Sequence, residues 1–100
     1  MDEIKIWENA LKLIGFKLSE NISMKNGNIL IFHFEKYSDD YCDYGFGNFQ
    51  YDTYHIEIWC ENSNIKNIKI KLNDSFINKE NFEKKYKSIF REVRIRSLSV

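Results

Sequence analysis

The sequence contains no proline and only four glycines, so it has few of the residues that mark linkers and domain boundaries. It also lacks an internal repeat. One hundred residues are enough for one hydrophobic core between two layers and too few for two domains. With 43% hydrophobic and 30% charged residues, the composition argues against a disordered chain. We therefore expect one compact domain over residues 1–100.

Long apolar runs are missing as well, and no segment is apolar for long enough to span a membrane. The N-terminus lacks the basic start and the uninterrupted apolar stretch of a signal peptide. These absences predict a cytoplasmic protein without a membrane partner. The two cysteines, Cys42 and Cys60, are then expected as thiols, with Cys60 a small core residue. They form no CxxC pair, so neither a metal site nor a cofactor is expected.

Apolar residues recur every three or four positions at both ends of the chain, which predicts two amphipathic helices. A helix over 2–14 is indicated by Ile4, Trp7, Ala10, Leu11 and Ile14, and Gly15 is placed to end it. A helix over 79–95, with Asn78 as its N-cap, is indicated by Phe82, Tyr86, Ile89, Phe90 and Val93.

Four segments between these helices alternate apolar and polar residues, as strands do: 16–24, 29–37, 54–60 and 65–72. In the first hairpin, Asn26-Gly27 allows a two-residue turn, which would set Ile22 opposite Ile31. A three-residue loop instead sets Ile22 opposite Leu30 and Leu18 opposite Phe34. We favour this register because it keeps the apolar residues of both strands, Met24 included, on one face.

In the second hairpin we expect Glu57 to face Lys69 across the two strands. The predicted fold is α+β, in the order α-β-β-β-β-α. It has a four-stranded antiparallel sheet with both helices packed on one face, and a loop at 38–48. Trp7 and Phe90 should accordingly lie on the same side of the sheet.

The predicted loop belongs to an unusual stretch, "YSDDYCDYGFGNFQYDTY" at residues 37–54. It holds five of the six tyrosines and four aspartates but no lysine or arginine. By sequence, residues 1–36, 37–65 and 66–100 carry formal charges of 0, −6 and +6. Tyrosines provide rigid contact area and aspartates complement a basic partner. We therefore predict a partner-binding surface made of Asp39, Asp40, Tyr41, Asp43, Tyr44, Phe46, Tyr51 and Asp52.

Two other interpretations of this stretch remain open. Its aromatic side chains could fold back to cover the edge of the core, with the aspartates serving as turn formers. A calcium site would need carboxylates at the D-x-D-x-D-G spacing, which "DDYCD" lacks.

Two further groups of residues could carry a function. His33 and His55 fall on the same predicted sheet face, but no nucleophile or phosphate-binding loop accompanies them, so we do not expect an enzyme. A basic stripe on the last helix, made of Lys84, Lys87, Arg91 and Arg94, could follow a phosphate backbone. We favour a solvated helix face instead, because these i,i+4 pairs match much of the charge: Glu80–Lys84, Glu83–Lys87 and Glu92–Arg96.

The chain as a whole resembles the small immunity proteins that accompany bacterial polymorphic toxins, including contact-dependent growth inhibition systems. The shared features are a single α+β domain, no catalytic motif, an acidic aromatic patch and a composition rich in lysine (12), isoleucine (14) and asparagine (11). No residue-level motif is shared, so the resemblance assigns no site residues. It implies tight binding of one cognate toxin, often a nuclease.

Three alternative functions rest on the same residues. A phage-encoded anti-CRISPR protein or another small inhibitor would use the acidic stretch as a nucleic-acid mimic. A nucleic-acid-binding module would use the basic stripe, and an enzyme would use the two histidines.

Overall fold

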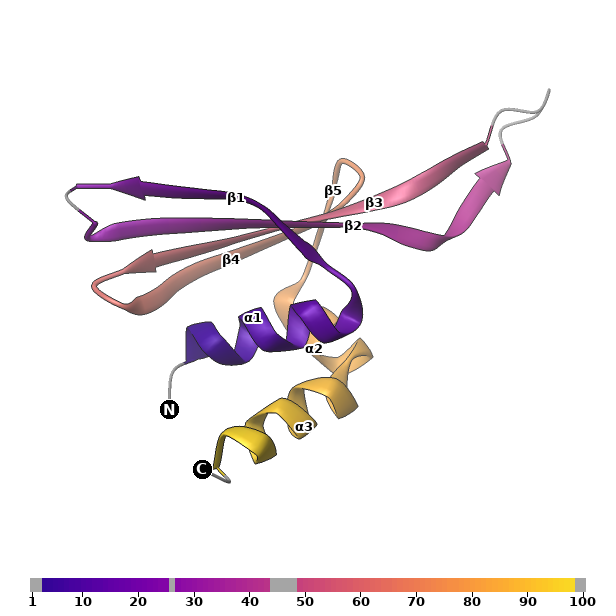
Figure 1. The fold of residues 1–100 in the computed structure, drawn as a ribbon. Helices are drawn as coiled ribbons and strands as arrows, with labels where there is room; N and C mark the ends of the chain where they lie inside the picture. Colours follow the sequence, from indigo (N-terminus) through magenta and orange to yellow (C-terminus); the bar gives the residue numbers. More distant parts are fainter. Residues whose placement is uncertain (1–2, 26, 44–48, 99–100) are drawn as a thin grey trace.

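The computed structural model of the protein describes residues 3–25, 27–43 and 49–98, with side chains throughout these ranges except at 38–51. In these ranges the elements are α1 (Glu3–Ile14), β1 (Lys17–Met24), β2 (Ile29–Asp43), β3 (Phe49–Glu61), β4 (Asn64–Leu72), β5 (Ser75–Ile77), α2 (Lys79–Lys85) and α3 (Lys87–Leu98). The strands form one antiparallel sheet in chain order, β1-β2-β3-β4-β5, and the helices lie on one side of it (Figure 1). The predicted α+β class with an antiparallel sheet is confirmed.

Helix α1 ends at Ile14, as its sequence predicts, and among the described residues it begins at Glu3. Trp7 and Leu11 are buried on its inner stripe. Gly15 adopts a φ of +118°, and its N–H donates to the Lys12 carbonyl at 3.1 Å. The next amide, of Phe16, donates to the Leu11 carbonyl at 2.9 Å. This pair of bonds is the usual glycine termination of a helix, and it turns the chain directly into β1.

The core lies between the helices and one face of the sheet. Its largest member is Trp7, whose ring centroid lies 4.7 Å from that of Phe90 and 6.1 Å from that of Phe82. Trp7 and Phe90 therefore lie on the same side of the sheet, as predicted. From the strands, the fully buried residues Phe34, Ile56, Ile58, Cys60 and Ile70 complete this core. Cys60 is a buried free thiol, as its place on an apolar strand face predicts.

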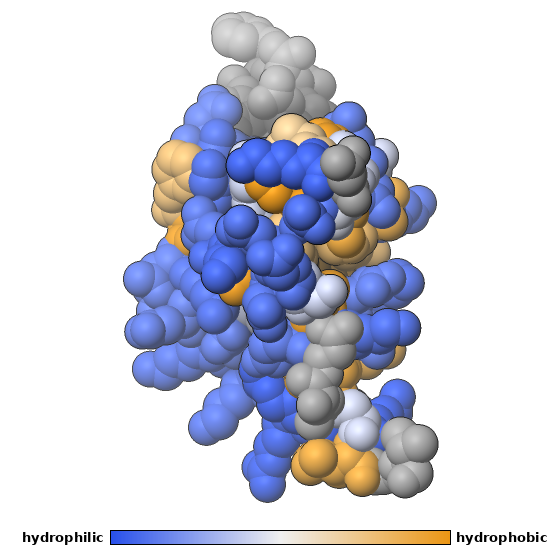
Figure 2. Space-filling view, turned by 90° about the vertical axis from the view of Figure 1, so that its left-hand side faces the viewer, coloured by the Kyte–Doolittle hydropathy of each residue, from blue (hydrophilic) through white to orange (hydrophobic). Residues whose placement is uncertain are grey.

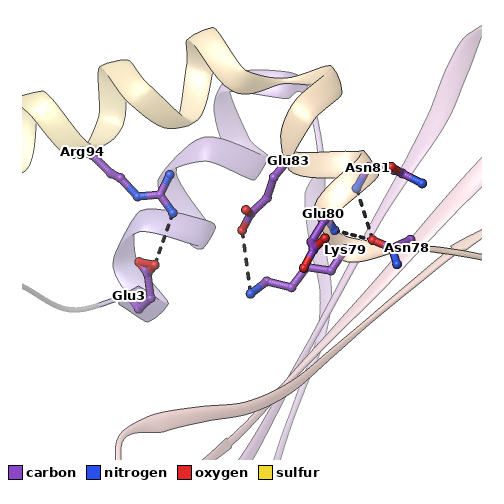
Figure 3. A network of polar contacts seen from close by, with 7 residues as sticks. All are labelled: Glu3, Asn78, Lys79, Glu80, Asn81, Glu83 and Arg94. Atoms are coloured by element: carbon purple, nitrogen blue, oxygen red, sulfur yellow. Dashed lines mark hydrogen bonds and ion pairs between the residues drawn. The ribbon is translucent and has the colours of Figure 1, made fainter.

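The C-terminal helical segment is two helices, so the prediction of one continuous helix over 79–95 is wrong. The chain bends at Tyr86, which has φ −110° and ψ 30° between the last residue of α2 and the first of α3. This bend allows Phe82 from α2 and Phe90 from α3 to reach the same Trp7 ring. Asn78 caps α2 as predicted: its side-chain oxygen accepts from the backbone N–H groups of Glu80 and Asn81 (Figure 3).

The first hairpin combines the two registers that the sequence allows. Leu18 pairs with Phe34 as predicted, but Ile22 pairs with Ile31, so the expected pairing of Ile22 with Leu30 is wrong. A β-bulge between Leu18 and Glu20 shifts the ladder by one residue and accounts for both observations. At the bulge the Ser19 hydroxyl donates to the backbone carbonyl of His33 at 3.0 Å.

The bulge also reverses the orientation of the rest of β1. Beyond it, Ile22 and Met24 pair with Ile31 and Ile29, which alternate with the helix-facing Phe32 along β2. Ile22 and Met24 therefore point away from the helices, with exposed fractions of 38% and 41%. Their predicted place in the core is wrong for this reason.

In the second hairpin Glu57 lies opposite Lys69, as predicted, and Ile56 lies opposite Ile70. Nearer the turn, the register shifts by one residue between Trp59 and Cys60. The sheet then continues into β5, so the predicted strand count of four is too low. Strand β5 covers only three residues, and it follows a tight turn in which Asn73 adopts a φ of +56°. Within the described residues, no helix combines the length and apolar character that a bilayer-spanning segment requires.

Candidate partner-binding hairpin

The acidic, tyrosine-rich stretch is part of the sheet rather than a loop. Strand β2 continues to Asp43 and β3 begins at Phe49, so the predicted loop at 38–48 is wrong for 38–43. Aspartate rarely occurs in strands, but here the hydrogen bonds between β2 and β3 hold these residues in an extended conformation. We call residues 37–54 the acidic hairpin. In Figure 1 the described parts of this hairpin extend beyond the helices, at the upper right.

The ladder of the acidic hairpin has one irregularity. Tyr37 pairs with Thr53, and the next pair towards the tip is Tyr41 with Tyr51. Between these pairs β2 has three residues, 38–40, where β3 has only Asp52. Such an excess on one strand bends a hairpin and increases its twist. The regular body of the sheet therefore ends at Tyr37, and the acidic part begins there.

Asn73 fastens the base of the acidic hairpin to the turn between β4 and β5. Its Nδ2 donates to Asp52 Oδ1 at 3.0 Å, and its Oδ1 accepts from the Thr53 N–H at 3.0 Å. Its own backbone N–H donates to the Thr53 carbonyl at 2.8 Å. Sequence reasoning missed this residue, although "LNDS" is a turn signal that could have located it.

The predicted site residues fall on both strands of the hairpin. Asp39, Asp40, Tyr41 and Asp43 lie in β2, whereas Tyr51 and Asp52 lie in β3. The ladder brings Tyr41 directly opposite Tyr51 and sets Asp43 opposite Phe49. Tyr44 and Phe46 lie outside the described residues.

The tyrosines at the two ends of the stretch have different surroundings. Tyr37 is 67% exposed, whereas Tyr54 is 9% exposed and belongs to the core. The Tyr54 hydroxyl accepts a hydrogen bond from Lys85 Nζ at 3.3 Å. At Tyr54 the interpretation as core edge therefore holds, and the exposed surface starts at Tyr37.

The two histidines meet on the sheet face that the helices leave uncovered. Their ring centroids are 5.6 Å apart, and His55 Nδ1 is 4.0 Å from a carboxylate oxygen of Glu35. Among the described residues, no group of three histidine, cysteine or acidic side chains is placed to hold a metal ion. The pair is half-buried in a mixed polar surface.

The basic stripe lies along the exposed side of α2 and α3. The side chain of Arg94 turns towards α1, where its Nη2 forms an ion pair with Glu3 Oε1 at 3.3 Å (Figure 3). Lys84, Lys87 and Arg91 form no ion pair with the residues that the structure describes, and they border two open grooves of about 820 Å³ each.

Only part of the expected charge matching on this stripe is present. The pair Glu92–Arg96 forms as predicted. Glu83, however, lies 3.8 Å from Lys79 (Figure 3). The break at Tyr86 separates Glu83 from Lys87 and explains this change of partner.

Comparison of the chain with protein-family models, curated proteins and solved structures finds no match. Function must therefore be argued from the surface chemistry of the chain itself.

Proposed function

We propose that this protein is an immunity protein, which binds a cognate bacterial toxin domain in the cytoplasm and neutralises it. The observation that carries the proposal is the acidic hairpin, which extends from the body of the fold and has no basic residue over 37–54. Its four aspartates give it a local charge of −4 in a chain whose formal net charge is zero. A nuclease is the toxin class that suits this surface best, because nuclease clefts are basic in order to bind phosphates.

The dimensions of the acidic hairpin support insertion into such a cleft. Opposite Tyr37–Asp43 of β2, β3 runs from Phe49 to Thr53, which is five residues or roughly 13 Å at the usual rise of a strand. An extension of this length can enter a cleft in a partner. Aspartates at the rim would steer the encounter, and tyrosines near the tip would provide the buried anchors.

The proposal predicts that a toxin domain is encoded beside this gene, and that domain provides the test. Co-expression of the chain should restore growth of cells that produce the toxin domain. A variant with Asn in place of Asp39, Asp40, Asp43 and Asp52 should associate at least about tenfold more slowly at low salt, with a flatter salt dependence. Asp52→Asn keeps the oxygen that accepts from Asn73, so the base of the hairpin is preserved.

A matched control changes the same amount of charge away from the acidic hairpin, by Gln substitution of Glu8, Glu61, Glu80 and Glu92. Its association should remain close to that of the wild type. Alanine at Tyr41 or Tyr51 should instead speed dissociation and cost about 2–4 kcal/mol of binding free energy. Equal loss in both four-residue variants, or an unchanged affinity in the four-Asn variant, would contradict the proposal.

The second candidate is a nucleic-acid-binding module, favoured by Lys84, Lys87 and Arg91, whose side chains have no ion-pair partner in the described part of the chain. It predicts binding of RNA or DNA that weakens when these three residues become glutamine. The four-Asn variant should leave that binding intact or strengthen it. Another small inhibitor, such as an anti-CRISPR protein, would use the acidic hairpin on a different basic target and would not restore growth against the toxin.

A further inference from the structure

The sheet face that the helices leave uncovered carries an apolar cluster of its own. Ile31 is only 7% exposed although it faces away from the helices, and it is not part of the core beneath them. Its neighbours across the strands are Ile22 and Trp59. Met24 and Ile29 continue the cluster towards the turn. In Figure 2, which views the molecule from the left of Figure 1, hydrophobic atoms reach the surface at several places in the upper part, between hydrophilic ones.

Charged residues border this cluster in an ordered row. Four residues lie side by side across the strands: Glu20 on β1, His33 on β2, Glu57 on β3 and Lys69 on β4. Trp59 is tied into the same surface, since its indole N–H donates to Glu57 at 3.1 Å and Lys69 Nζ lies 5.0 Å from its ring centre. The row therefore reads acid, histidine, acid, base from one edge to the other.

When a second copy of this row is laid over the first in the opposite order, each acidic side chain faces a lysine or a histidine. A twofold axis along the strands, placed between β2 and β3, lays β1 of one copy over β4 of the other. Glu20 then faces Lys69, and His33 faces Glu57. The apolar row beside it, Ile22-Ile31-Trp59-Asn67, sets Ile31 against Trp59. An isologous contact requires this reciprocity, in which residue i meets j and j meets i.

We propose that the uncovered sheet face is a homodimer interface, formed face to face with a second copy of this chain about such an axis. Four strands at about 4.8 Å spacing and four paired rows at about 6.7 Å give a face of roughly 500 Å² per copy, or about 1,000 Å² in total. The two outer rows add area but little complementarity, because they set Lys17 against Lys71 and Ile29 against Glu61. This area is at the lower limit for a specific interface. The dimer is therefore weak, with a dissociation constant on the order of 10 µM or higher.

The proposed dimer interface is separate from the acidic hairpin, so the dimer and the proposed immunity function can be tested independently. The four-Asn variant of the acidic hairpin should dimerise like the wild type. A chain that dimerises but does not protect against a toxin would disprove only the proposed function.

Sedimentation equilibrium from about 1 to about 500 µM tests the dimer. The average mass should rise from 12.1 kDa towards twice that value. Glu20→Lys and Lys69→Glu should each weaken dimerisation by about tenfold, because each places like charges together across the interface. The double variant should return to within about fivefold of the wild type. Within one copy these residues are three strands apart, about 14 Å, so this rescue can act only between copies.

Lys5→Glu on the exposed side of α1 serves as the control, since it changes the charge as much as Lys69→Glu does but lies on the helix side of the sheet. It should dimerise like the wild type. Melting curves of the variants confirm that each one folds. The proposal is overturned if the wild type stays at 12.1 kDa at the highest concentration, or if the double variant is no better than the weaker single variant.

Discussion

Lys85 shows how one residue can join a strand to a helix through its charge. It donates to the Tyr54 hydroxyl and lies 5.7 Å and 5.5 Å from the ring centres of Tyr54 and Tyr86. The hydrogen bond to Tyr54, followed by the charge of the Tyr86 phenolate, raises the pKa of Lys85 above its usual 10.5. A raised pKa of a cation means that the folded state holds the proton more tightly. The resulting stability is complete below pH 10.5 and is lost as the pH rises through the folded-state pKa.

Tyr54→Phe should remove the hydrogen-bond acceptor and lower the free energy of unfolding by about 1 kcal/mol at neutral pH. Part of this difference from the wild type should vanish as the pH rises through the folded-state pKa of Lys85, because Lys85 then loses its proton in both proteins. Urea denaturation at several pH values measures this difference in unfolding free energy. Tyr37→Phe is the matched control, because Tyr37 is 67% exposed and its hydroxyl should contribute little. A difference that stays constant up to strongly alkaline pH would contradict this role of Lys85.

At the scale of elements, the turn between β4 and β5 holds the base of the acidic hairpin through a single residue, Asn73. Asparagine tolerates the left-handed backbone that this turn requires, and Asn73 has a φ of +56°. In this conformation its side-chain amide reaches β3. The positioning of the acidic hairpin thus depends on a residue about twenty positions further along the chain.

Asn73→Gly should keep the turn conformation and lose both side-chain hydrogen bonds, at a cost of about 1 kcal/mol in unfolding free energy. Asn73→Ala should cost more, because alanine also strains the left-handed backbone. Chemical denaturation of the two variants separates the hydrogen bonds from the backbone strain. Equal stability of Asn73→Gly and the wild type would show that the contacts to Asp52 and Thr53 do not matter.

Elements with strong local signals could be predicted from the sequence, and those that depend on tertiary pairing could not. Helix α1 follows from the spacing of its apolar residues and from Gly15, and the second hairpin follows from clean alternation. The bulge in β1 could not be predicted from the sequence, because residues on both faces of this strand are exposed and its pairing register is therefore weakly specified. Strand β5 is too short to show a pattern, and the break at Tyr86 leaves the apolar spacing of the helix unchanged.

The candidate site was predictable in composition but not in shape. The charge and aromatic content of the acidic hairpin are visible in the sequence, whereas its strand pairing depends on β2 and β3 continuing to bond beyond Tyr37. Aspartates at 39, 40 and 43 argue locally against a strand, so the ladder could be seen only once the two strands were placed together.

At the scale of the whole molecule, charge is divided between regions, and the histidine pair belongs to the uncovered sheet face rather than to the acidic hairpin. We expect the double variant His33→Ala, His55→Ala to protect against the toxin within a few fold of the wild type. Growth of toxin-producing cells measures protection, and a binding assay with the same variant is its control. A variant that still folds and binds the toxin domain but no longer protects would instead indicate catalysis.

The two edges of the sheet have a consequence for how this protein behaves when it is abundant. An open strand edge is a template on which further chains can add, and long flat edges promote fibrous aggregation. Here one edge strand, β1, is interrupted by the bulge at Ser19. On the other side β5 covers β4 only at Ile70–Leu72, so β4 is the outer strand over residues 64–69. Of the two edges, the one formed by β4 is therefore the more open to the addition of a further strand when the protein is abundant.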